Sequence, residues 1–233
     1  MKVDIFSLCH QEVKLLPYYM RHYSQYGQVY LYEGHSTDGT AELAKSLGAI
    51  IVPFDTGNEV RDDLFQNMKN NCWKNSDADW AIVCDMDEFI YHPDFLKYLE
   101  TVQGTIIMPR TYEMMSDTFP TTTGQIYDEV KYGFEGSRKM FLFKPHELRG
   151  INYGAGAHAA LPEGNVIINR DSEIICMHMR HLSIDYVVER NAYLSKRLSA
   201  INRQNRWGWH TELPRKAIED FYAQYRSTLK KII

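Results

Sequence analysis

The chain has 233 residues, 44% hydrophobic and 24% charged, with a formal net charge of −4 at pH 7. This composition excludes wholesale disorder and predicts a single globular domain over residues 1–233. It gives no electrostatic support for nucleic-acid binding, and no apolar run is long enough for a transmembrane segment. The four cysteines lack zinc or redox spacing and the N-terminus lacks a signal-peptide pattern, so we expect reduced thiols and a cytoplasmic location.

Strand and helix signals alternate through the first half of the chain. Strands are predicted at 3–9, 28–32, 49–54, 79–84 and 105–109, and helices at 12–26, 41–47, 59–74 and 93–100. Repeated β-α-β units with apolar strands predict an α/β fold whose central, mostly parallel sheet is covered by helices. Right-handed crossovers bring the loops after the strands to one sheet edge, where ligands bind in open α/β sheets.

The second half has a different pattern. Residues 110–170 are rich in Gly, Thr, Tyr and Pro, which predicts a small irregular antiparallel addition. A further strand is expected at 173–179, followed by C-terminal helices at 183–202 and 213–232. No linker or internal repeat interrupts the chain, so a single domain is the expectation.

The most specific motif is the acidic run at residues 85–88 (DMDE), which directly follows the predicted strand at 79–84. Asp85 and Asp87 project from the carboxyl edge of the sheet and can share Mg²⁺ or Mn²⁺ with diphosphate oxygens. The plain alternative is a solvated acidic turn. Acids between apolar runs are costly to bury unless they are paired or metal-bound, and this favours the metal site.

A polar turn at residues 33–40 (EGHSTDGT) follows the second strand. Its glycines allow backbone N–H groups to approach a ligand, and Glu33 or Asp38 can accept hydrogen bonds from a ribose or base, with His35 between them. The alternative is a turn that caps the next helix.

Two histidines end the strand expected at 173–179 and lie on either side of an arginine. His178 can complete a cation site begun by Asp87, because imidazole with carboxylate is an acceptable Mn²⁺ ligand set. A lone histidine is more often structural, and His181 is the other choice.

Small residues surround His158, which suits either a loop that closes over a ligand or a plain flexible turn. Arg61 and Lys139 are candidate phosphate partners, although either can equally be an ordinary surface charge.

Together these motifs resemble the nucleotide-sugar glycosyltransferases of the GT-A fold, specifically the family 2-like group. The resemblance starts at CHQE followed by LLPYYMRHY, continues through EGHSTDGT, and is highest at DWAIVCDMDEF. A weaker match covers residues 174–191. The tail from residue 203 matches no part of the family pattern.

The resemblance implies a metal-dependent glycosyltransferase that moves a sugar from a nucleotide-sugar donor to a saccharide or other hydroxyl acceptor. The donor it implies is a UDP-sugar or another nucleotide-sugar. It implies that residues 1–110 bind the donor and 111–182 the acceptor, ahead of C-terminal helices at 183–233. Glu33 and Asp38 then face base and ribose, Asp85 binds ribose and cation, Asp87 binds the cation, and His178 is the third protein ligand.

The catalytic base of an inverting transfer is expected in the irregular segment after the fifth strand. Asp117, Glu135 and His158 are the candidates, and Asp117 is placed ahead of His158 because a carboxylate is ionised at neutral pH. Two other functions are open. A nucleotidyltransferase is disfavoured because SLCHQE lacks the Gly-rich basic loop of that class, and intact acids at 85 and 87 argue against a non-catalytic nucleotide-sugar or glycan-binding relative.

Overall fold

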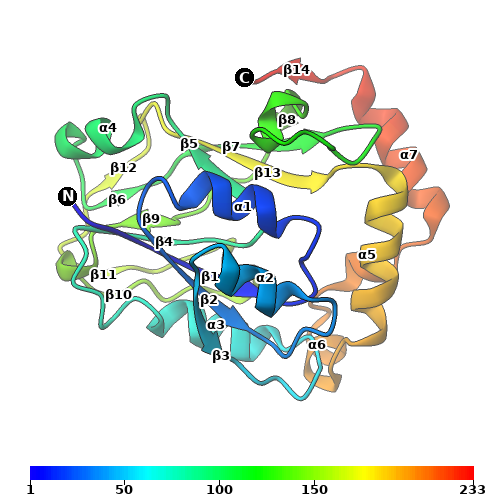
Figure 1. Ribbon diagram of the computed structural model, residues 1–233, viewed down its shortest axis with the longest axis horizontal. Coiled ribbons are helices and arrows are strands. Elements are labelled where there is room, and N and C mark those ends of the chain that lie inside the picture. The colour runs from blue at the N-terminus through cyan, green and yellow to red at the C-terminus, as the bar shows by residue number, and fades with distance from the viewer.

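The computed structural model of the protein describes residues 1–233, and a seven-stranded sheet lies at its centre (Figure 1). The strand order is β12-β6-β9-β4-β1-β2-β3. The strands are β1 (Val3–Cys9), β2 (Gln28–Glu33), β3 (Ile50–Pro53), β4 (Trp80–Val83), β6 (Ile106–Ile107), β9 (Leu142–Phe143) and β12 (Ile168–Asn169). Strands β3, β2, β1 and β4 run parallel, whereas β9 is antiparallel to both β4 and β6.

A second, five-stranded sheet has the order β14-β8-β7-β13-β5. Its strands are β5 (Glu88–Tyr91), β7 (Arg110–Met115), β8 (Tyr132–Glu135), β13 (Ile175–His181) and β14 (Lys230–Lys231). Strand β13 is parallel to β7 and antiparallel to β5. A separate antiparallel pair joins β10 (Leu148–Gly150) to β11 (Glu163–Gly164).

Helices cover the sheets and form one side of the molecule (Figure 1). The α-helices are α1 (Leu16–Tyr23), α2 (Thr40–Ser46), α3 (Asp62–Asn71), α4 (Phe95–Thr101), α5 (Ile184–Lys196), α6 (Ala200–Asn205) and α7 (Arg215–Arg226). Short 3₁₀ turns are η1 (Ile126–Asp128), η2 (Pro145–Glu147), η3 (Ala155–Ala157) and η4 (Trp209–Glu212). No helix has both the length and the apolar character needed to cross a membrane.

The central sheet is apolar on both faces, because alternate residues of β1 pack in two different cores. Ile5 belongs to a cluster of 37 buried residues and Phe6 to a second cluster of 10. In the second cluster the Trp73 and Phe143 rings meet edge to face with centroids 5.0 Å apart. The covered faces leave the strand ends as the place for a ligand.

The predicted α/β fold is confirmed, with differences at the ends of elements. The helix expected at 183–202 is divided into α5 and α6, because the Ser199 hydroxyl accepts the Asn202 N–H at 3.2 Å and starts a new helix. The helix expected at 213–232 ends at Arg226, and the last residues form β14 against β8. The edge pairing of β14 depends on a partner about a hundred residues away, which periodicity does not reveal.

Candidate active site

A cleft of about 480 Å³ lies at the carboxyl ends of the central strands. Its walls come from the ends of β1, β2 and β4, from α3 and α5, and from the segment 206–211 after α6. The predicted site residues that line it are Asp85, Asp87, Lys139, His158 and His178. The cleft therefore lies where the sheet topology predicts a ligand site.

The acidic run is held by two hydrogen bonds within the turn between β4 and β5, one of them to a side chain. The Glu88 N–H donates to the Asp85 carbonyl at 3.0 Å, and the Asp85 N–H donates to a Glu88 carboxylate oxygen at 2.9 Å. This closed turn fixes Asp85 and Asp87 at the cleft, with side chains 34% and 6% exposed. The acids are therefore largely removed from water and need partners.

Each acid has a cationic partner from a different element. Lys69 Nζ on α3 lies 2.6 Å from Asp85 Oδ1, and Arg190 Nη1 on α5 lies 2.9 Å from Asp87 Oδ2. Lys139 pairs with the buried Glu88. Burial favours a raised pKa for Asp85, but the charges of Lys69 and Lys139 outweigh it and lower the pKa.

Burial also acts to raise the pKa of Asp87, and Arg190 and His178 together hold it well below its usual range. Both aspartates are thus ionised at neutral pH. The partner cations offset part of the negative charge of these two aspartates, and only the remainder is available to a ligand in the cleft.

His178 lies between two carboxylates. Its Nδ1 is 3.0 Å from Glu113 Oε1, and its Nε2 is 3.5 Å from Asp87 Oδ1. Burial alone favours a low pKa, but Asp87 and Glu113 raise the pKa of His178 to about 10. A histidine that donates one ring N–H to a carboxylate is the usual second-shell arrangement of a metal ligand.

The donor set suits a divalent cation only in part. Asp87 Oδ1 and His178 Nε2 face one another, whereas Asp85 is turned to Lys69, and no group of three or more His, Cys, Asp or Glu side chains could hold a metal. The predicted set of Asp85, Asp87 and His178 is therefore not preassembled. Asp87 and His178 lie together at the cleft, and Asp85 is paired with Lys69.

In the turn at residues 33–40, both acidic side chains form hydrogen bonds with the backbone of the turn itself. The Glu33 carboxylate accepts the N–H groups of His35 and Ser36 at 3.0 and 2.7 Å, and Asp38 accepts the Thr40 N–H at 3.1 Å. Neither these acids nor His35 lines the cleft. Local hydrogen bonds thus occupy both carboxylates, and the binding of a nucleotide-sugar by Glu33, His35 and Asp38 stays a prediction.

Two other expected positions lie outside the cleft. Asp117 is exposed and ion-paired with Arg226 on α7, so it is not placed as the catalytic base. Arg61 forms a two-pronged pair with Asp63, at 2.8 and 2.7 Å, and does not line the cleft either. In both places the charge is paired with a neighbouring side chain of opposite charge.

His158 does reach the cleft, from the turn at η3. Burial and the nearby charge of Lys139 lower the pKa of His158, so its imidazole is neutral at pH 7. A neutral imidazole can accept a proton.

The sequence motifs missed several residues of the cleft. Arg190 bridges Glu12 and Asp87, with its Nη2 3.1 Å from Glu12 Oε1. Burial raises the pKa of Glu12 to about 7 despite the charge of Arg190. The acidic run itself was a signal for such partners in the sequence, because buried acids require cations on the helices that cover the sheet edge.

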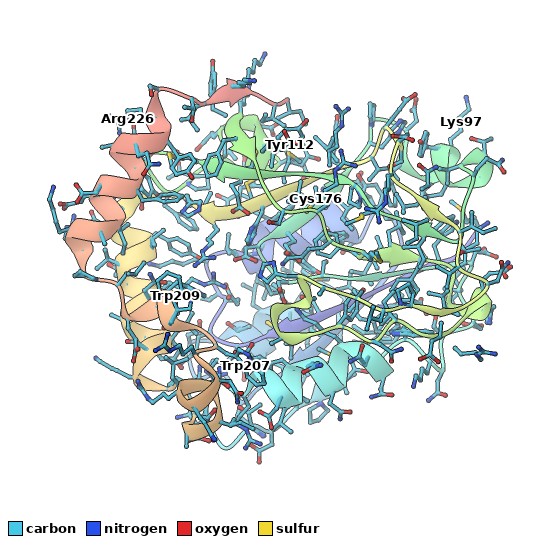
Figure 2. All side chains as sticks on the ribbon, turned by 180° about the vertical axis from the view of Figure 1, so that it is seen from behind. Lys97, Tyr112, Cys176, Trp207, Trp209 and Arg226 are labelled. Carbon is cyan, nitrogen blue, oxygen red and sulfur yellow. The ribbon has the colours of Figure 1, made fainter.

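The segment 206–211 is the other missed part of the cleft. Arg206 and Gly208 both have left-handed backbones, with φ of 56° and 73°, and the chain turns sharply there. All six residues line the cleft, and Trp209 is 60% exposed. Figure 2 shows Trp207 and Trp209 on the chain between α6 and α7, beside α5.

Comparison with known proteins gives likeness only to solved structures. No family model and no curated protein matches the chain. Glucosyl-3-phosphoglycerate synthase from Mycobacterium tuberculosis, in complex with Mn²⁺, UDP and glucosyl-3-phosphoglycerate, is 14% identical, with 48% of this chain and 44% of that chain covered and a TM-score of 0.34. S. aureus TarS 1–349 in complex with UDP-GlcNAc is 9% identical, with 84% and 66% covered and a TM-score of 0.42.

Mannosyl-3-phosphoglycerate synthase from Rubrobacter xylanophilus is 15% identical, with 48% of this chain and 40% of that chain covered and a TM-score of 0.33. The chain thus spans less than two thirds of the length of each of these three proteins.

Proposed function

We propose that the protein is a glycosyltransferase of the GT-A fold that moves a sugar from a nucleotide-sugar, a UDP-sugar, to a hydroxyl acceptor. One observation carries the proposal. Ionised Asp87 faces His178 Nε2 across 3.5 Å, at the sheet edge where α/β folds bind nucleotides. Residues 1–110 then supply the donor half of the site and 111–182 the acceptor half, and the C-terminal residues 183–233 close the cleft.

The site is proposed to hold Mn²⁺ or Mg²⁺ through Asp87 and His178, with Asp85 as the adjacent acid. Such a cation, when bound, offsets the negative charge on the departing nucleoside diphosphate. His178 must give up its Nε2 proton to bind it, while Nδ1 keeps its hydrogen bond to Glu113. Metal affinity should therefore rise with pH.

The cations of the chain have a separate role in this proposal. Lys69, Lys139 and Arg190 hold the acids ionised and fix their orientation before any ligand arrives. Diphosphate oxygens that enter the cleft meet these same cations, which are short-range partners for phosphate. Lys139 is thus kept as a donor-binding residue, paired with Glu88 in the free protein.

His158 is the proposed base of an inverting transfer. Its neutral imidazole takes the proton of the acceptor hydroxyl as the hydroxyl oxygen attacks the anomeric carbon and the nucleoside diphosphate leaves. Asp117 is not proposed again, because it lies outside the cleft. The loop 154–158 also lines the cleft, so the base is held next to the ligand space.

The proposal can be tested with a panel of nucleotide-sugars in a thermal-shift assay, with and without Mn²⁺, followed by donor hydrolysis for those that bind. His178→Ala and His181→Ala form a matched pair, since both rings lie near Glu113 but only His178 lines the cleft. We expect a UDP-sugar to stabilise the protein in a metal-dependent way that His178→Ala removes and His181→Ala keeps. Stabilisation without any hydrolysis, with or without acceptor, supports instead a non-catalytic binding protein.

A further inference from the structure

Arg180 is a cation of the cleft wall that has no partner in the protein. It lies on β13, lines the cleft, and its side chain makes neither an ion pair nor a hydrogen bond with the rest of the protein. Lys69, Lys139 and Arg190 each have a carboxylate partner, and the partly buried Arg197 donates to the Asn58 carbonyl. Arg180 is therefore the partly buried cation of the cleft whose hydrogen-bond donors are left for a ligand.

Leaving a guanidinium unpaired in a largely buried place is unfavourable. Burial lowers the pKa of Arg180, while Asp87 and Glu113 act in the opposite direction from a distance. An arginine stays charged in proteins, so its five N–H donors remain to be satisfied. Its planar fork matches an oxyanion, a phosphate or a carboxylate, through two parallel hydrogen bonds.

The position of Arg180 separates it from the proposed metal ligands. It follows His178 by two residues on the same strand, which is about 6–7 Å along an extended backbone. His210, in the segment 206–211 of the cleft wall, has a pKa lowered to about 4 by burial first and then by the charges of Arg180 and Arg190. Arg180 and the segment 206–211 therefore line the same cleft as the proposed metal ligands Asp87 and His178.

We infer that Arg180 binds an anionic group of the acceptor, a phosphate or a carboxylate, and so selects an acidic hydroxyl compound over a neutral one. The inference rests on the proposed function, which places the donor diphosphate at Asp87 and His178. An oxyanion at Arg180 could also come from the donor diphosphate itself. The two sources differ in whether UDP blocks the site.

The test is calorimetric binding of two probes, inorganic phosphate and UDP with Mn²⁺, to wild type, Arg180→Gln and Arg180→Lys. Arg61→Gln is the matched control, because Arg61 lies outside the cleft. Phosphate is titrated alone and again into the UDP complex. We expect phosphate to bind the UDP complex of wild type and Arg61→Gln, and to bind Arg180→Gln at least about tenfold more weakly, with UDP affinity unchanged.

Three results overturn the inference. One is a loss of UDP affinity in Arg180→Gln of about tenfold or more, which assigns Arg180 to the donor. The second is equal phosphate binding by wild type and Arg180→Gln, and the third is no phosphate binding by wild type at high millimolar concentration. Arg180→Lys keeps the positive charge but lacks the planar guanidinium group, and it replaces Arg180→Gln in the phosphate titration if the glutamine variant fails to fold. Failure of wild type to bind UDP contradicts the proposed function instead, and the phosphate titration without UDP still tests Arg180.

Discussion

Arg190 offers the sharpest test of the electrostatics of the cleft. It bridges Glu12 and Asp87, whose side chains are only 11% and 6% exposed. Arg190→Gln removes the cation and leaves two acids close together in a buried place. Breaking a buried ion pair from one side costs about 3–5 kcal/mol, so we expect a loss of about 3 kcal/mol in the free energy of unfolding at pH 8.

The loss should depend on pH with a definite sign. The pKa of Glu12 is already raised to about 7 by burial, and without Arg190 it rises further. A carboxyl with a raised folded pKa stabilises the protein fully below its unfolded pKa and loses that contribution as pH rises through its folded pKa. Arg190→Gln should therefore be much less harmful at pH 5 than at pH 8, and Glu12→Gln in the same chain should restore part of the stability at pH 8.

Urea unfolding at the two pH values measures the effect. Arg215→Gln is the control, because the pairs of Arg215 with Asp185 and Glu219 are exposed and should contribute less than about 1 kcal/mol. An Arg190→Gln variant that loses no more than the control at pH 8, or loses the same amount at pH 5, would refute the reasoning.

Three further predictions follow from single contacts. His158→Ala should lower turnover by a factor of about 100 or more while UDP affinity is kept, and an unchanged rate means that the base lies elsewhere. Burial lowers the pKa of His22 from 6.5 to about 4, so the unfolded chain takes up the proton first and the free energy of unfolding falls as pH drops from 6.5 to 4. In urea titrations, His22→Gln should make this pH dependence shallower. An unchanged pH dependence would argue against the buried neutral histidine. The Ser183 hydroxyl accepts the Tyr186 N–H at 3.1 Å at the start of α5, so Ser183→Ala should cost about 1 kcal/mol by thermal unfolding, and Ser183→Asp should cost less.

Local signals made part of the site predictable. The apolar run of β4 followed at once by two spaced acids places Asp85 and Asp87 at the sheet edge, whatever the rest of the chain does. His178 is expected near the end of another strand; β13 continues to His181, and His178 Nε2 lies 3.5 Å from Asp87 Oδ1. The strand and helix order of the first half follows from the same short-range patterns.

Contacts between distant segments were not predictable. Arg190 meets Asp87 across 103 residues, and Asp117 meets Arg226 across 109, so neither pair leaves a local pattern. The segment 206–211 lines the cleft only because α5 and α6 return the chain to it. Glu33 is a different case, because its carboxylate accepts the N–H groups two and three residues later in the same turn, which is a purely local interaction.

The most direct test of the proposed function is calorimetric binding of UDP to wild type, Asp87→Asn and Asp117→Asn, with Mn²⁺ and with a chelator. Asp117 is the matched control because it is a carboxylate outside the cleft. We predict that Mn²⁺ strengthens UDP binding to wild type and to Asp117→Asn but has no effect on Asp87→Asn. At 100 times the dissociation constant the bound ligand should also stabilise wild type by about 2.7 kcal/mol. The same metal-dependent binding by Asp87→Asn and wild type, or no UDP binding at all, would contradict the account.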